Sequence, residues 1–214
     1  MNKLISILLA HLSTAVFFAL LFTTTVPAST FNTPSILIIG DSLSAAYNMP
    51  QEAGWVSLLE QRLSERNFTF TVVNASIIGD TTAGGLSRLD KALRYAKPRL
   101  TIIELGGNDG LRGLPIDAMR NNLSEMITTA QASGSKVVLL GTQLPPNYGP
   151  QYTSDFSISF ALLADKHHAA LVPSMLKGFE DNLDYFQADQ IHPSADAQNL
   201  ILENVWPTIK SLLD

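Results

Sequence analysis

Three residues near opposite ends of this 214-residue chain have the types and spacing that nucleophilic catalysis requires. Ser42 lies in Gly-Asp-Ser-Leu-Ser, directly after the apolar run 35–39, and Asp189 precedes His192 by three residues. Within one turn of chain a carboxylate at i and an imidazole at i+3 can meet. Asp189 can then accept the Nδ1 proton, which leaves Nε2 of His192 free to take the proton of Ser42. We therefore predict Ser42 as nucleophile, His192 as base and Asp189 as the acid that orients it.

Ser42 and His192, taken alone, have simpler interpretations. Asp41 or Ser42 would serve as a helix N-cap at a strand-to-helix junction, and His192 would be a surface-loop histidine before a proline. It is the combination of the three residue types that favours catalysis.

A serine nucleophile also needs hydrogen-bond donors for the oxyanion that forms on the substrate. The sequence Gly-Gly-Asn-Asp-Gly supplies the side-chain amide of Asn108, and Gly79 and Ser42 supply backbone N–H groups. For each of these residues, an ordinary turn is the alternative. We predict that Ser42, Gly79 and Asn108 form an oxyanion hole.

Hydrophobic periodicity predicts the elements that position these residues. Near-continuous apolar runs predict strands covered on both faces, and apolar residues at helical spacing lie between them. The expected strands are 35–39, 69–73, 100–104, 136–140 and 169–172. The expected helices contain 56–63, 86–93, 119–130, 156–167 and 197–212, with Pro207 kinking or splitting the last one. Five such units predict one α/β/α sandwich around a five-stranded parallel sheet.

In such a sheet the ligand site lies beyond the carboxyl ends of the strands. Ser42, Gly79 and Asn108 each follow one of the expected strands, so we expect them at a common edge. Asp165, His167 and His168 close a helix just before a strand, which predicts a structural role at the opposite edge, where positive charge suits the helix dipole. Glu104 ends a strand near the site, and the sequence leaves open whether it is a satisfied buried carboxylate or supports the catalytic residues.

Composition excludes several other classes of function. The formal net charge is −5 with no basic stripe, so nucleic acid is not an expected partner. The absence of cysteine rules out disulfides, thiolate metal sites and a cysteine nucleophile. Acyl transfer to water through Ser42 would require no metal and no organic cofactor.

Two other sequence motifs are absent. The glycines around Asn108 do not form the dinucleotide-binding pattern, which argues against a dinucleotide site. Gly-x-Ser-x-Gly is absent around Ser42, which argues against the nucleophile elbow of the α/β-hydrolases.

The first 28 residues have the composition of a secretory signal. Lys3 gives a positive start, an apolar stretch follows, and Val26-Pro27-Ala28 ends in small residues. We expect cleavage after Ala28, a periplasmic or secreted mature protein and no stable membrane anchor. An uncleaved anchor is the alternative, since roughly 19 residues nearly span a bilayer.

The four blocks that hold these residues resemble, in identity and order, those of the GDSL or SGNH hydrolases. The blocks are Gly-Asp-Ser-Leu-Ser, Asn-Ala-Ser-Ile-Ile-Gly-Asp, Gly-Gly-Asn-Asp-Gly and Asp-x-x-His. The resemblance covers nearly all of residues 29–214 and implies a flavodoxin-like hydrolase domain. It also implies the same roles for Ser42, Asp189, His192, Gly79 and Asn108.

The resemblance further implies hydrolysis of small-molecule esters and thioesters through an acyl-enzyme, of the acyl-CoA thioesterase, lysophospholipase and arylesterase type. Pro145 and Tyr148, in the loop after the fourth expected strand, are candidates for an apolar wall beside an acyl chain, with a stiff surface loop as the alternative. A carbohydrate O-acetylesterase of the same family, or a non-catalytic module that binds a small anionic ligand, remains open.

Overall fold

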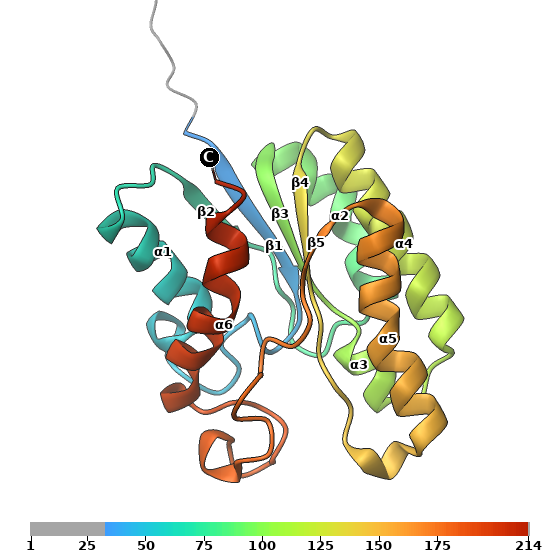
Figure 1. Ribbon diagram of the computed structural model, residues 1–214. Helices are drawn as coiled ribbons and strands as arrows, with labels where there is room; N and C mark the ends of the chain where they lie inside the picture. The colour runs from blue at the N-terminus through green and yellow to red at the C-terminus, as the bar shows by residue number, and fades with distance from the viewer. Residues whose placement is uncertain (1–32, 214) are drawn as a thin grey trace, which may run out of the picture. The chain divides into compact units, whose positions relative to one another are not determined.

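A five-stranded parallel sheet forms the centre of the protein in the computed structural model, which describes residues 33–213 (Figure 1). The strands lie in the order β2-β1-β3-β4-β5, the doubly wound order expected of a flavodoxin-like sandwich. The strands are β1 (Ser35–Gly40), β2 (Thr71–Asn74), β3 (Pro98–Glu104), β4 (Lys136–Leu140) and β5 (Ala170–Val172). They agree with the apolar runs of the sequence to within two residues at each end, so the predicted fold class is confirmed.

Helices cover both faces of the sheet. They are α1 (Trp55–Glu65), α2 (Thr82–Ala96), α3 (Gly107–Leu111), α4 (Ile116–Ala132), α5 (Pro150–His167) and α6 (Gln198–Lys210). Short 3-10 turns are η1 (Gln51–Ala53), η2 (Pro146–Tyr148), η3 (Leu183–Tyr185) and η4 (Ala195–Ala197). Helices α1 and α6 lie on one face, and α2, α4 and α5 lie on the other (Figure 1).

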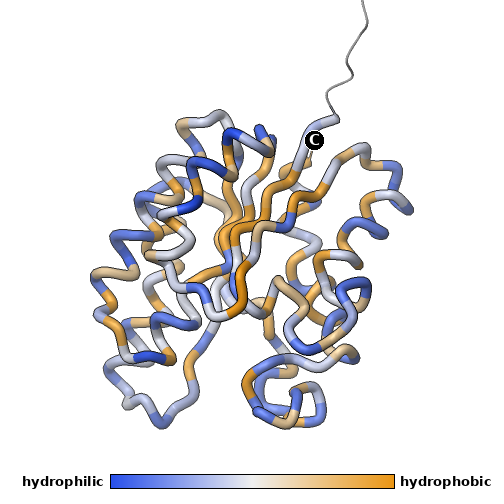
Figure 2. The backbone as a smooth tube through the Cα atoms, turned by 180° about the vertical axis from the view of Figure 1, so that it is seen from behind, coloured by the Kyte–Doolittle hydropathy of each residue, from blue (hydrophilic) through white to orange (hydrophobic). Residues whose placement is uncertain are grey.

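The side chains of β1 show how one strand serves both layers. Ile36 and Ile38 belong to the core beneath α1 and α6, whereas Leu37 and Ile39 belong to the core beneath α2, α4 and α5. All four are fully buried. Successive side chains of a strand point to opposite faces, so an unbroken apolar run is the pattern that a two-sided sheet requires. Figure 2 shows the result as a hydrophobic centre with hydrophilic residues along the outer helices.

The last helix differs from the sequence-based expectation. Its periodic pattern begins at Ala197, but the α-helix starts at Gln198 after the η4 turn, and it continues through Pro207 to Lys210 without splitting. Buried Val205, Trp206 and Ile209 lie on both sides of the proline, so packing against the core offsets the hydrogen bond that Pro207 cannot donate.

The two histidines at the end of α5 lie at the edge of the sheet where β5 begins, as expected. Nε2 of His167 lies 2.6 Å from Oγ of Ser124, and Gln131 donates to the His167 carbonyl. Partial burial, and then the neighbouring Lys166 and His168, lower the pKa of His167. The lowered pKa of His167 reduces the positive charge that this side chain adds at the end of α5, where Lys166 is the other basic residue of the last turn.

The junction after β4 generates a test of the fold. Gly141 donates its N–H to the Val172 carbonyl at 2.8 Å, and a Cβ at position 141 would lie 2.4 Å from the carbonyl oxygen of Pro173. Because that neighbour is backbone, Gly141→Ala should lower the free energy of unfolding by about 1–3 kcal/mol in urea titrations. Gly107→Ala is the matched control, since its nearest new contact is 3.5 Å, and it should change stability by about 1 kcal/mol at most. Equal stability of the two variants would contradict the packing at Gly141.

Candidate active site

Ser42 lies just beyond the end of β1, at the start of a series of turns that covers 42–48. Oδ1 of Asp41 accepts the N–H of Leu43 at 3.0 Å, and its carbonyl accepts the N–H of Ala45, also at 3.0 Å. No helix starts here, since α1 begins at Trp55 with Gly54 at its N-cap. The helix-cap interpretation of Asp41 and Ser42 is thus excluded, and Asp41 instead anchors the turn that presents Ser42.

A continuous chain of hydrogen bonds joins Ser42 to the carboxyl-terminal part of the protein. Oγ of Ser42 lies 2.9 Å from Nε2 of His192, and Nδ1 of His192 lies 2.7 Å from Oδ2 of Asp189. The three-residue spacing predicts the contact between Asp189 and His192, and the contact between His192 and Ser42 is the one that a serine nucleophile with a histidine base requires. The arrangement has the geometry in which a carboxylate orients an imidazole toward a hydroxyl.

Asp189 holds both the backbone and the ring of His192. Its Oδ1 accepts the N–H groups of Ile191 and His192, each at 3.0 Å, while Oδ2 faces the ring. Partial burial acts to raise the pKa of Asp189, but these hydrogen bonds and the His192 ring outweigh it and lower the pKa to about 2. Asp189 is therefore an anion at any pH near neutrality, as an orienting acid must be.

Two residues that the sequence did not single out also hold His192. The ring of Tyr47 lies 4.2 Å from the imidazole, centroid to centroid. Gln187 donates its backbone N–H to the His192 carbonyl at 2.8 Å and its side-chain amide to the Tyr47 carbonyl at 2.9 Å. Tyr47 and Gln187 are 140 residues apart in sequence, so no local spacing rule would have paired them.

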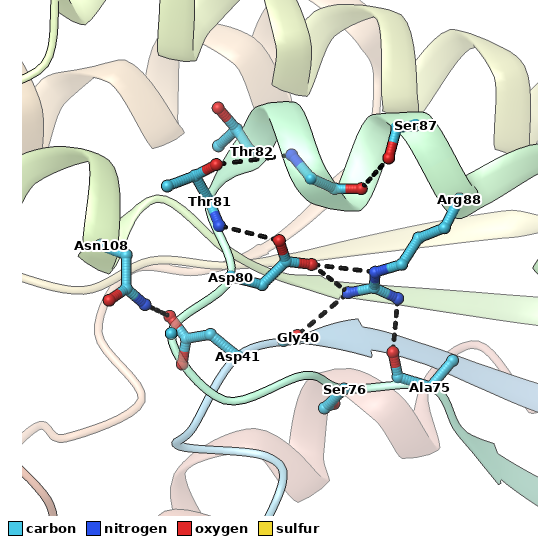
Figure 3. Close-up of polar contacts among 12 residues, drawn as sticks. Gly40, Asp41, Ala75, Ser76, Asp80, Thr81, Thr82, Ser87, Arg88 and Asn108 are labelled. Carbon is cyan, nitrogen blue, oxygen red and sulfur yellow. Dashed lines mark hydrogen bonds and ion pairs between the residues drawn. The ribbon is translucent and has the colours of Figure 1, made fainter.

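Asn108 lies in the first turn of α3, beyond the end of β3, and is tied to the Ser42 turn. Its Nδ2 donates to Oδ2 of Asp41 at 2.9 Å (Figure 3). Gly106 precedes it with φ +117°, where an added Cβ would lie 3.2 Å from Met119 and Phe160. Glycine at 106 thus permits the turn that brings Asn108 beside Asp41.

Gly79 lies in the loop after β2 in a left-handed conformation with φ +74°. Its carbonyl accepts a hydrogen bond from Arg112 at 2.6 Å, and Arg112 immediately follows α3. Ile77, two residues earlier, donates its N–H to the Gly40 carbonyl at 3.0 Å. The loops of Ser42, Gly79 and Asn108 are thus linked to one another, and the role of Gly79 and Asn108 as oxyanion donors stays a prediction.

Two buried carboxyl groups lie beneath Ser42. Oε2 of Glu104 accepts the Asp41 N–H at 3.2 Å and the Ser44 hydroxyl at 2.8 Å, so Glu104 is a satisfied buried group that supports the turn. Burial, and then the charge of Asp41, raise the pKa of Glu104 well above its usual range. Burial also raises the pKa of Asp41 to about 6, against the opposing effects of the Leu43 N–H, the Asn108 amide and His192.

The loop after β4 packs toward α3. The hydroxyl of Tyr148 donates to the Leu111 carbonyl at 2.9 Å, while Pro145 is exposed. A Cβ on Gly110 would meet Leu144 at 2.6 Å, so this loop lies directly against the helix that carries Asn108. Contact of Pro145 and Tyr148 with a substrate stays a prediction.

Neither a metal cluster nor a membrane span is found in the part of the chain that the structure describes. Within residues 33–213, no three or more Asp, Glu or His side chains are grouped so that they could hold a metal ion. None of the helices in this range is both long and apolar enough to cross a bilayer.

The three-layer α/β sandwich, with Ser, His and Asp side chains in contact at the carboxyl ends of its strands, has the arrangement of a serine hydrolase. Residues 38–200 match the GDSL-like lipase/acylhydrolase family. The chain belongs to this family.

Known relatives cover most of the chain. Esterase TesA of Pseudomonas aeruginosa is 51% identical over 84% of this chain and 89% of its own. Thioesterase 1/protease 1/lysophospholipase L1 of Escherichia coli K12 is 37% identical over 84% of this chain and 85% of its own. The crystal structure of the psychrotrophic esterase EstA from Pseudoalteromonas sp., inhibited by monoethylphosphonate, superposes with a TM-score of 0.80 at 40% identity, over 84% of this chain and 98% of that one.

The raised pKa of Asp41 predicts a pH-dependent contribution to stability. Its pKa is about 6 in the folded protein against 3.8 for the ordinary side chain, so the folded state binds this proton more tightly. The contribution is fully present below about pH 4 and is lost as the pH rises through about 6. Relative to Asp41→Asn, the wild type should lose on the order of 2 kcal/mol of unfolding free energy between pH 4 and pH 7. A stability difference between the two proteins that does not change with pH would contradict this.

Proposed function

We propose that the protein is a serine esterase that hydrolyses carboxylic esters and thioesters. One observation carries the proposal: the unbroken chain from Asp189 through His192 to Ser42, with contacts of 2.7 and 2.9 Å. A module that only binds a ligand does not need an imidazole oriented toward a hydroxyl, so this chain favours catalysis over binding.

The reaction follows from the positions of these groups. Oγ of Ser42 attacks the carbonyl carbon as Nε2 of His192 takes its proton, and the charge of Asp189 stabilises the imidazolium. His192 then gives this proton to the departing alcohol or thiol, and the acyl group remains on Ser42. A water molecule, deprotonated by His192, releases the acid and restores the serine.

The tetrahedral oxyanion would be held by the Ser42 N–H, the Gly79 N–H and the Asn108 amide. Asn108 is suited to this role because one of its two Nδ2 hydrogens is fixed on Asp41, which sets the direction of the other. Donors whose orientation is fixed before the reaction stabilise developing charge without reorganisation.

The surroundings of the site favour an apolar acyl group. Ile78 directly precedes Gly79 and Ile191 directly precedes His192, and these two residues are 56% and 46% exposed. Large aliphatic side chains exposed next to catalytic groups are expected where an acyl chain binds. We call Ile78 and Ile191 the apolar rim of the site. This rim, together with the names of the relatives, supports acyl esters, thioesters and lysophospholipids over acetylated carbohydrates as substrates. Pro145 and Tyr148 would extend the apolar wall from the loop after β4.

We also propose that residues 1–28 are a secretory signal cleaved after Ala28, which would leave residues 29–214 as the hydrolase domain in the periplasm or the medium. This segment lies outside the described residues, and the proposal rests on its positive start, apolar centre and small residues before Ser29. Amino-terminal sequencing of the exported protein tests it, and a mature chain that begins at Met1 would disprove it.

The nucleophile is tested by covalent labelling. An organophosphonate should add one phosphonyl group to the wild type, and mass spectrometry of peptides should locate it on Ser42. Ser42→Ala should lose both the label and nearly all turnover, whereas Ser57→Ala, a serine on α1, should keep both. Labelling of Ser42→Ala at the wild-type rate would refute the assignment.

The oxyanion donor is tested by removing the amide of Asn108. Asn108→Ala should reduce kcat by about 10²- to 10³-fold with a smaller change in KM, because the lost hydrogen bond strengthens only in the transition state. Steady-state kinetics with a nitrophenyl ester measures both constants. An unchanged kcat would exclude Asn108 from the oxyanion hole.

The acyl preference is tested at the rim. Ile78→Ser should reduce kcat/KM for nitrophenyl decanoate by roughly tenfold, the effect of about 1.4 kcal/mol of lost apolar contact, and should leave nitrophenyl acetate nearly unchanged. Ile158→Ser, on α5 and similarly exposed at 49%, is the matched control. Equal losses for both esters would argue against an acyl-binding rim at Ile78.

A further inference from the structure

Arg88, on α2, joins the ends of two strands to the loop that carries Gly79 (Figure 3). Its Nη2 donates to the Gly40 carbonyl at 3.2 Å, and its Nη1 donates to the Ala75 carbonyl. Its Nε and Nη2 lie 2.9 and 2.7 Å from Oδ2 of Asp80. One guanidinium thus contacts the end of β1, the segment that leaves β2 and the residue next to Gly79.

Asp80 is itself fixed by local contacts. Its Oδ1 accepts the N–H of Thr81 at 3.0 Å, so both carboxylate oxygens have partners. The side chains of Arg88 and Asp80 are only 19% and 12% exposed. A pair this well covered is screened much less by salt and solvent than a surface pair.

The contact between Asp80 and Arg88 requires a residue without a side chain at position 84. Gly84 lies within α2, where glycine costs about 1 kcal/mol relative to alanine. A Cβ at this position would lie 1.8 Å from Oδ1 of Asp80. Any side chain at 84 would therefore displace the Asp80 carboxylate and with it the contact to Arg88.

We propose that Arg88 and Asp80 are positioning residues that fix the N–H of Gly79 relative to the N–H of Ser42. The inference rests on the proposed function, because it assumes that both N–H groups bind the oxyanion. The Gly40 carbonyl held by Arg88 lies two residues before Ser42, and Asp80 directly follows Gly79. The ion pair thus links the two donors through a short and rigid path.

Few other hydrogen bonds hold this loop. Ile77 donates to the Gly40 carbonyl at 3.0 Å, and Asp80 donates to the Ile77 carbonyl at 3.1 Å. The Gly79 carbonyl accepts from Arg112 at 2.6 Å, but this contact is exposed, and Ile77 and Ile78 are more than half exposed. An arginine is required because its planar group reaches two carbonyls and a carboxylate at once. The compact ammonium of lysine cannot reproduce that fork.

The test compares Arg88→Met and Arg88→Lys with the wild type in the whole protein, with nitrophenyl acetate as substrate. Arg88→Met should lower kcat by roughly 10- to 100-fold with KM within about threefold, because misplaced donors weaken binding of the transition state alone. The rate constant of inactivation by an organophosphonate should fall by a similar factor. Arg88→Lys should lie between Arg88→Met and the wild type.

Arg62→Met is the control for the loss of an equally covered arginine that forms an ion pair away from the site. Arg62 pairs with Glu203 at 2.6 Å between α1 and α6, and its side chain is also 19% exposed. It should retain kcat within twofold. If folded Arg88→Met keeps kcat within twofold, or if both variants lose kcat to the same extent, the positioning role is wrong.

Gly84→Ala gives an independent readout if Arg88→Met does not fold. It keeps both charges, raises helix propensity and displaces only the Asp80 carboxylate, so it should lower kcat at least fivefold; wild-type kcat would overturn the inference. Ser42→Ala, measured in parallel, distinguishes a failure of the proposed function from a failure of the positioning role. Activity that survives in Ser42→Ala would overturn the proposed function, whereas an inactive Ser42→Ala beside a fully active Gly84→Ala would overturn only the role of Asp80 and Arg88.

Discussion

The contact between Oγ of Ser42 and Nε2 of His192 is the interaction on which the rest of the site depends. These residues are 150 positions apart, and the 2.9 Å distance between them exists only because the sheet brings the end of β1 beside the segment before α6. Four other residues hold one of these two groups in place. Asp189 and Tyr47 hold the imidazole, while Asp41 and Glu104 hold the turn that carries the hydroxyl.

The topology of the sheet explains why the site forms at this edge. The chain passes from β1 to β2 on one side and then returns to β3 on the other, so the loops after β1 and β3 leave the sheet at a switch point. Ser42 and Asn108 lie in those two loops, and the hydrogen bond between Asp41 and Asn108 spans the switch point. Gly79, beyond neighbouring β2, completes the set of loops.

The electrostatics of the site are divided between its two sides. Asp189 is stabilised as an anion by two backbone N–H groups and the imidazole, which lowers its pKa to about 2. Asp41 and Glu104 lie deeper, and burial raises the pKa of both. Hydrogen-bond donors to the carboxyl groups of Asp41 and Glu104 act against this rise in pKa. The same hydrogen bonds that hold the Ser42 turn therefore also influence the ionisation of the two groups.

Much of the fold and part of the site could be predicted from the sequence. The five strands were recognisable because a sheet buried on both faces needs unbroken apolar runs, and the contact between Asp189 and His192 because it lies within one turn. The packing of Tyr47 on His192 and the three-way contact of Arg88 could not be predicted, since they depend on which strands are neighbours. The continuation of α6 through Pro207 was likewise decided by tertiary packing, against local propensity.

The most direct measurement of the central claim is a crystal structure of the organophosphonate adduct. The account predicts a covalent bond from Oγ of Ser42 to phosphorus. It also predicts that one phosphonyl oxygen lies about 2.7–3.1 Å from the N–H nitrogens of Ser42 and Gly79 and from Nδ2 of Asn108. His192 should remain hydrogen-bonded to Asp189. A phosphonyl oxygen that points to solvent, or a label on another residue, would contradict the account.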